Sequence, residues 1–203
     1  MRRVTVVVAL LLSAACSSKQ KTAPPAPGRE HVGPVAVGSP GPGETLREHD
    51  LNHDGRTDVW TYLVKAADGK ELVVRKEKDL NNDGRIDSWE LYGPEGTVTR
   101  LTYDMDFDAK ADVSLLFEKD QLVRKEYAFG FDGVPHSFNY YEKNRLVRKE
   151  RDANGDGKID TWEYWESGEA DRVGVDNDGD GQVDRWETRK TAQAPEGEAS
   201  PKK

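Results

Sequence analysis

An acidic segment recurs along the chain at nearly constant spacing and limits what the chain can fold into. Its pattern is Asp-x-Asn/Asp-x-Asp-Gly-x-x-Asp, with Trp at position 11. Full copies begin at Asp50, Asp79, Asp152 and Asp176. Decayed copies begin at Asp104 and Ala128, and the last four starts are 24 residues apart. A unit this short cannot enclose a core alone, so successive copies must stack on one another.

The segments between the acidic copies favour strands over helices. Only 15 residues separate position 9 of one late copy from position 1 of the next, and they are rich in Trp, Tyr, Val and Thr. Turn signals such as Gly93-Pro94 and Ser167-Gly168 interrupt them. The sequence therefore predicts an all-β fold, in which tandem hairpins of about 24 residues form a curled antiparallel meander. Strands are expected at 86–92 and 97–103. The alternative is a dockerin-like repeat of loop plus helix.

The acidic pattern resembles the calcium loops of EF-hands, dockerins, thrombospondin type 3 repeats and integrin-type propeller repeats. The resemblance implies that positions 1, 3 and 5 bind Ca²⁺ through side-chain oxygens, position 7 through its carbonyl and position 9 directly or through water. A Glu at position 12 closes an EF-hand site, whereas the first copy has Thr61 there. The predicted ligands are Asp50, Asn52, Asp54, Asp58, Asp79, Asn81, Asp83, Asp87, Glu90, Asp152, Asn154, Asp156, Asp160, Glu163, Asp176, Asp178, Asp180, Asp184 and Glu187.

The two decayed copies are predicted to differ from the others. The first has Ala109 in place of the loop glycine, and its Asp104, Asp106, Asp108 and Asp112 are predicted to form a weaker site. The second lacks carboxylates at positions 1 and 3 and is predicted to be a plain hairpin loop. Asp-Gly and Asn-Gly also occur in ordinary turns, but a turn does not need three further oxygens in register.

The first residues resemble the export signal and lipobox of bacterial lipoproteins. Arg2 and Arg3 precede an apolar run at 4–12, and Ser13-Ala14-Ala15 leads to Cys16, the only cysteine. The resemblance implies a signal peptide at 1–15, a diacylated (palmitate-bearing) Cys16, and membrane anchoring through that lipid. Ser17 and Ser18 favour outer-membrane sorting. Residues 16–44 are predicted to be a disordered tether, 45–190 the repeat domain and 191–203 a disordered tail. An ordinary secretory signal is the alternative.

Composition and motifs narrow the functional classes. The net charge of −8 argues against nucleic acid as a partner. No nucleophile elbow, phosphate loop or zinc spacing occurs, so no enzymatic activity is expected. The sequence predicts a calcium-binding lipoprotein of the outer membrane or cell surface, structural or adhesive, with polysaccharide or envelope proteins as partners. The alternative is a calcium-dependent carbohydrate-binding module that uses the position 11 tryptophans, which otherwise form a core rung.

A second short element, Val-Arg-Lys-Glu, recurs ahead of the acidic loops at 74–77, 123–126 and 147–150. We interpret it as a solvated strand face with ion pairs across strands.

Overall fold

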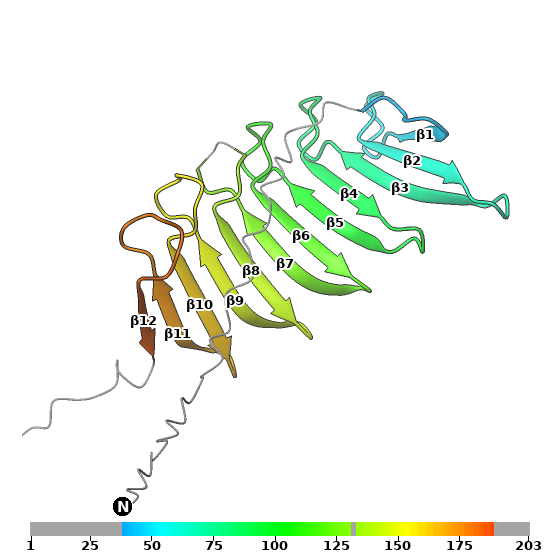
Figure 1. Cartoon of the computed structure of the whole chain (residues 1–203). Coiled ribbons are helices and arrows are strands. Elements are labelled where there is room, and N and C mark those ends of the chain that lie inside the picture. Colours follow the sequence, from blue (N-terminus) through cyan, green and yellow to red (C-terminus); the bar gives the residue numbers. More distant parts are fainter. Residues whose placement is uncertain (1–37, 131–132, 189–203) are drawn as a thin grey trace, which may run out of the picture.

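The computed structural model describes residues 38–130 and 133–188, which form one antiparallel sheet of twelve strands (Figure 1). Each strand pairs with the next along the chain, so the sheet is an uninterrupted meander. The strands are β1 (Glu44–His49), β2 (Val59–Lys65), β3 (Glu71–Lys78), β4 (Ser88–Tyr92), β5 (Val98–Tyr103), β6 (Val113–Glu118), β7 (Gln121–Tyr127), β8 (Ser137–Glu142), β9 (Arg145–Arg151), β10 (Thr161–Glu166), β11 (Glu169–Val175) and β12 (Arg185–Thr188). The predicted all-β meander is confirmed. No helix occurs in the described residues, and the dockerin-like alternative is wrong.

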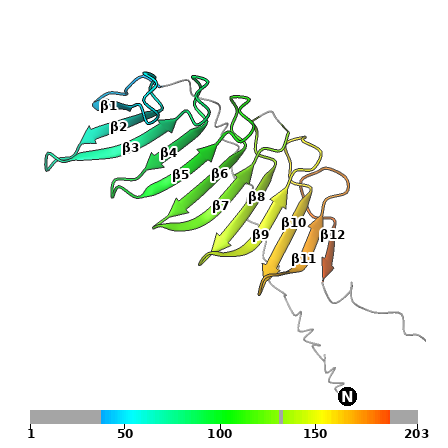
Figure 2. The same ribbon diagram turned by 180° about the vertical axis from the view of Figure 1, so that it is seen from behind.

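The acidic segments form the connections at one end of the sheet, and tight turns form those at the other. Because adjacent strands run antiparallel, every second connection emerges at the same end. Figure 2 shows the six longer loops side by side along that edge. Backbone hydrogen bonds continue the pairing into the loops. The N–H of Asp79 donates to the carbonyl of Asp58 at 3.0 Å, and that of Asp104 to the carbonyl of Asp87 at 2.8 Å. Position 1 of each loop is thereby held against position 9 of the preceding loop.

One face of the sheet carries a row of residues in register across all twelve strands, most of them large side chains or glutamates, with Thr102, Ser114 and Gly174 as the small members. Trp60 lies opposite Glu77, which lies opposite Trp89, and the row continues through Phe138 and Trp162. The first three full-copy tryptophans are only 6–8% exposed, whereas Trp186 in β12 is 40% exposed. Packing occurs in separate small clusters, to which the loops contribute position 8 residues such as Ile86 and Ile159.

The Val-Arg-Lys-Glu elements form buried ion pairs on this same face, which corrects their interpretation as solvated. Glu77, Glu126 and Glu150 are at most 5% exposed. Each pairs with the arginine two residues earlier in its own strand, such as Arg75 with Glu77 at 2.5 Å. Buried charges of this kind require such partners, because the desolvation of an unpaired carboxylate is very costly.

Tyrosines complete the ion pairs. The guanidinium carbon of Arg75 lies 3.5 Å from the ring centroid of Tyr62, whose hydroxyl donates to Glu77 at 3.1 Å. Arg148, Tyr140 and Glu150 repeat the arrangement, with 4.0 Å and 2.9 Å for the same two contacts. Each unit joins a cation, a ring and a carboxylate from adjacent strands.

The described end of the predicted tether lies against the sheet. The Tyr62 hydroxyl donates to the carbonyl of Gly38, and Arg75 donates to that of Ser39 at 3.2 Å. Residues 38 and 39, assigned to the tether from the sequence, thus contact side chains of β2 and β3. The predicted signal peptide at 1–15, Cys16, the rest of the tether up to residue 37 and the predicted tail at 191–203 lie outside the described residues.

Stability should fall at high pH through Tyr62. Burial, together with the charge of Glu77, raises the pKa of Tyr62 to about 12, above the value of about 10 in an unfolded chain. The folded chain holds this proton more tightly, so the contribution of Tyr62 is complete below pH 10 and lost as the pH rises through 12. Urea unfolding should show a decline in stability over that interval. Tyr62→Phe keeps the ring beneath Arg75 and should make the decline shallower; an identical decline would contradict this assignment.

Candidate metal sites

Five of the six loops curl around the same hydrogen bonds to the carboxylates at positions 1 and 9. In the loop 79–87, Asp79 accepts the N–H groups of Asn82 at 2.7 Å and Gly84 at 2.8 Å. Asp87 accepts those of Leu80 at 2.7 Å and Asn81 at 3.2 Å. Equivalent bonds occur in the loops that begin at Asp50, Asp104, Asp152 and Asp176.

The side chains at positions 3 and 5 also accept backbone N–H groups of their own loop. Asn81 accepts the N–H of Asp83 at 2.9 Å, and Asp83 accepts that of Arg85 at 2.8 Å. The other four loops repeat both bonds. A carboxylate has about four lone-pair sites, so an oxygen that accepts one N–H can still coordinate an ion. The backbone thus pre-arranges the oxygens at positions 1, 3, 5 and 9 within each loop.

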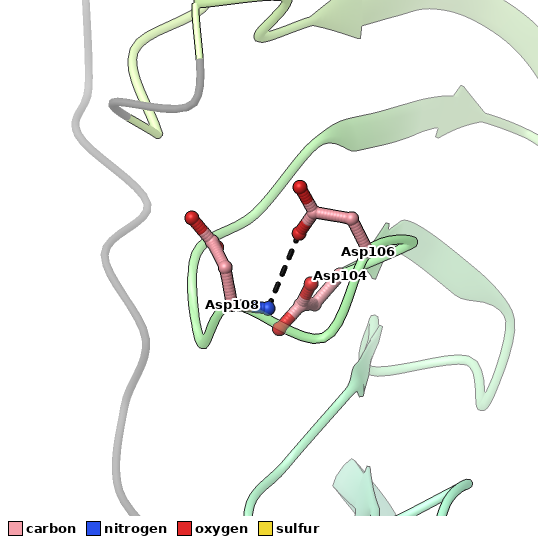
Figure 3. A group of neighbouring side chains, drawn as sticks. All are labelled: Asp104, Asp106 and Asp108. Atoms are coloured by element: carbon pink, nitrogen blue, oxygen red, sulfur yellow. Dashed lines mark hydrogen bonds between the residues drawn. The ribbon is translucent and has the colours of Figure 1, made fainter.

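Three carboxylates converge in each of two loops. Oxygens of Asp104, Asp106 and Asp108 all lie within 4.8 Å of one another, as do those of Asp176, Asp178 and Asp184. Figure 3 shows the first group, with the N–H of Asp108 bonded to Asp106 at 3.2 Å. Like charges this close disfavour joint ionisation unless a cation lies among them. Calcium, which prefers six to eight hard oxygen ligands, suits such a donor set.

The direction of the pKa shift differs among the loop carboxylates. Burial raises the pKa of Asp87, as do the nearby carboxylates of Asp79 and Asp83. Burial also raises the pKa of Asp104, and the charges of Asp112 and Asp108 raise it further. The pKa of Asp50 is lowered, chiefly by the Gly55 N–H. Desolvation acts to raise the pKa of Asp176, but the N–H groups of its own loop, chiefly those of Gly181 and Gly179, outweigh it and lower that pKa.

The Asp104 loop has the same geometry as the full copies, despite the missing glycine. Ala109 adopts a φ of 70°, close to the 87° of Gly84, and its N–H donates to Asp104 at 2.7 Å. The weaker site was predicted because Ala109 was expected to hinder the tight turn at position 6, and that turn nevertheless forms. Position 4 also takes positive φ, as in Asn82 and Gly155, which the sequence analysis did not single out. The Asn and Gly residues at this position were the available signal.

The glutamates at position 12 are not brought to the loops. Glu90 binds Lys78 and the Tyr92 hydroxyl, and Glu163 accepts the indole N–H of Trp165 at 3.0 Å. Glu187 pairs with Arg185 at 2.8 Å. Consecutive strand residues point to opposite faces, so the burial of the position 11 tryptophans turns position 12 to the other face. This corrects the predicted ligand role of these three residues.

The fourth loop departs from the pattern, and its Asp132 lies outside the described residues. His136 occupies position 9, and its N–H donates to the Tyr127 carbonyl at 2.8 Å. Its Nδ1 lies 3.6 Å from the carboxylate of Asp152, position 1 of the next loop. The imidazole thus contacts a neighbouring candidate site.

Burial of three of the four position 11 tryptophans argues against a sugar platform, and Trp186, at 40% exposure, is the exception. The indoles of Trp60, Trp89 and Trp162 are covered within the sheet. A sugar ring cannot stack on a face that protein already covers. The carbohydrate-binding alternative, which relied on these residues, is not supported.

Comparison with known proteins supports the calcium loops. A family model described as an EF hand matches residues 150–166, which contain the Asp152 loop. No curated protein matches the chain. Among solved structures, a mutant of S. aureus TarM in complex with fondaparinux, alpha-GlcNAc-glycerol and UDP matches at 9% identity and a TM-score of 0.34. The match covers 63% of this chain and 21% of TarM, so the chain spans about a fifth of that protein's length.

The expectation of no enzymatic activity is withdrawn, because it rested only on the absence of familiar sequence motifs. A TM-score of 0.34 is too low to transfer an activity to this chain. The lack of familiar catalytic motifs is therefore no basis for classing the chain as a non-enzyme.

Ala109 and Gly84 provide a matched test of the turn. An alanine at positive φ is strained by about 1–2 kcal/mol. Ala109→Gly should therefore stabilise the sheet by about 0.5–1 kcal/mol, after the loss of backbone entropy. Gly84→Ala should destabilise it by a similar or larger amount. Urea unfolding at fixed calcium measures both; destabilisation by Ala109→Gly would show that the turn is not strained.

Proposed function

We propose that this protein binds Ca²⁺ through five loops along one edge of its sheet. The hydrogen bonds shared by the five loops carry the proposal, since they fix the side chains at positions 1, 3, 5 and 9, and three carboxylates converge in the Asp104 and Asp176 loops. The EF-hand match at 150–166 supports it independently for one loop. Because the glutamate at position 12 would not coordinate the ion, each site would have few protein oxygens as ligands, and water would supply the rest. This favours a modest affinity, with Kd about 10⁻⁴–10⁻³ M as in extracellular modules.

Calcium would have a structural role in this proposal. The sheet packs through small clusters, while its loop edge gathers most of the aspartates. The loop 79–87 carries three aspartates and one arginine, a net charge of −2. One Ca²⁺ would bring it to zero and relieve repulsion with the adjacent loops. An ion that binds only the folded state stabilises it by about 2.7 kcal/mol at 100-fold excess over Kd.

We further propose an envelope location, in which acylated Cys16 anchors the sheet to the outer membrane and envelope proteins or polysaccharide are its partners. The signal-like segment and lipobox at 2–16 support this. The described residues contain no helix with the length and apolarity needed to cross a membrane.

Calorimetry should count five calcium ions per chain. Asp83→Ala and Asp156→Ala should each remove one ion, because each deletes a position 5 ligand from a single loop. Glu90→Gln is the matched control and should leave the count at five, because Glu90 binds Lys78 and Tyr92. A count of one or none would mean that the loops are turns only. Loss of one ion in Glu90→Gln would show that Glu90 is a calcium ligand, as position 12 is in EF-hands.

Mass spectrometry of the protein from its native membrane should find lipid on Cys16. The Cys16→Ser variant should lose both the lipid and its membrane fractionation. An unmodified N-terminus, with all of the protein soluble, would overturn the anchoring proposal.

A further inference from the structure

Exposed apolar side chains gather on the acidic loop edge. Seven large apolar residues are recorded as exposed in the described chain, and five of them belong to the loops. Four occupy position 2 of consecutive loops: Leu51, Leu80, Met105 and Phe129, at 55–67% exposure. The backbone N–H groups of Leu51 and Leu80 are directed into the loop toward Asp58 and Asp87, while their side chains remain outside.

The meander places these side chains in a line. They follow β1, β3, β5 and β7, so each is two strands from the next. With neighbouring strands about 4.8 Å apart, the steps are about 9.6 Å. A protein partner usually needs about 800 Å² of continuous complementary surface. Isolated apolar side chains at this spacing suit a fluid lipid surface, into which each can insert separately.

Cationic side chains accompany the line. Position 7 is Arg56 and Arg85 in the first two loops, both exposed, and Lys110 in the third. The loops 50–58 and 79–87 each carry a net charge of −2, which one bound Ca²⁺ would cancel. Metal-free loops would be repelled by an anionic bilayer. With calcium bound, the loops 50–58 and 79–87 would present arginine and an apolar tip to it with no net charge. The loop 104–112, with four aspartates and one lysine, would fall from −3 to −1.

We infer that the loop edge around Leu51, Leu80 and Met105 docks on an anionic phospholipid surface when its loops hold calcium. The inference rests on the proposed calcium binding and adds a partner to it. The contact is separate from any lipid on Cys16. In this arrangement calcium acts by removing a charge barrier, and the apolar side chains are exposed before docking.

Vesicle sedimentation tests the inference, using the full chain with Cys16→Ser so that no acyl chain contributes. Vesicles of phosphatidylcholine, with and without phosphatidylserine, are compared at about 1 mM calcium and in chelator. Binding in chelator measures any contribution of the apolar run at 4–12 and is subtracted. Calcium should increase sedimentation with the phosphatidylserine vesicles only. Equal calcium-dependent binding to both vesicle types would overturn the anionic requirement and the inference with it.

Substitutions on and off the edge identify the contact. Leu51→Ser and Leu80→Ser should each weaken calcium-dependent binding about tenfold, since each removes one large apolar side chain from the lipid. Arg85→Ala should weaken it about fivefold. Leu91→Ser is the matched control, because Leu91 is 40% exposed on β4, away from the loops, and it should change nothing. Equal losses in Leu91→Ser and Leu80→Ser would overturn the assignment.

Calorimetry on the same samples separates the two proposals. Calcium binding without calcium-dependent sedimentation would overturn the docking inference and leave the proposed function standing. Absence of calcium binding would overturn the proposed function itself.

Discussion

Backbone pairing between neighbouring repeats is the constraint on which the rest of this structure depends. The described chain has a single sheet and no second layer, so each strand is held only by the strands beside it. The pairing does not stop where the strands end. The backbone N–H of Asp104 donates to the carbonyl of Asp87, and that of Asp176 donates to the carbonyl of Asp160 at 2.9 Å. The loops themselves are therefore joined in a ladder. The loop edge is therefore a continuous part of the sheet.

A single layer leaves both faces near water, which explains the unusual packing of the tryptophan face. Apolar residues are scarce, and the rows alternate rings with ion pairs such as Arg148 and Glu150. Burial raises the pKa of Glu150, while Arg148 and the Tyr140 hydroxyl oppose that rise. Replacing one partner would leave a buried charge alone, which typically costs about 3–5 kcal/mol. These units fix the register of the strands, because each joins side chains from adjacent strands.

The repeat spacing made the fold predictable. Period, turn signals and aromatic content led to an antiparallel meander, and the strands expected at 86–92 and 97–103 match β4 and β5 closely. The burial of Trp60 follows from the scarcity of other large apolar residues. The face of a strand residue was harder to assign. A lone Glu77 reads as solvated, and only the arrangement of Tyr62 and Arg75 around it explains its burial.

The site was predicted in outline and misjudged in two respects. Positions 1, 3, 5 and 9 each accept a local bond from their own loop backbone, and three carboxylates converge in the Asp104 and Asp176 loops. Glu90 was misplaced because the EF-hand analogy assumes a helix after the loop. In a strand, position 12 faces away from position 11. Because Trp89 is buried on one face, Glu90 lies on the other face. The Asp104 loop was predicted to bind more weakly because Ala109 replaces the loop glycine. The bond from the Ala109 N–H to Asp104 nevertheless holds Ala109 at positive φ.

The shared ladder also determines how far one loop can affect another. An ion bound to the Asp79 carboxylate would order a residue whose backbone N–H donates to the carbonyl of Asp58 in the preceding loop. Binding in one loop therefore biases its immediate neighbours, as expected for repeats whose coupling is between nearest neighbours. The fourth loop interrupts this chain of acidic sites, since it has His136 at position 9. His136 still contacts Asp152 of the fifth loop. For the proposed calcium binding, we therefore expect stronger coupling within the three loops before it and within the two after it than across it.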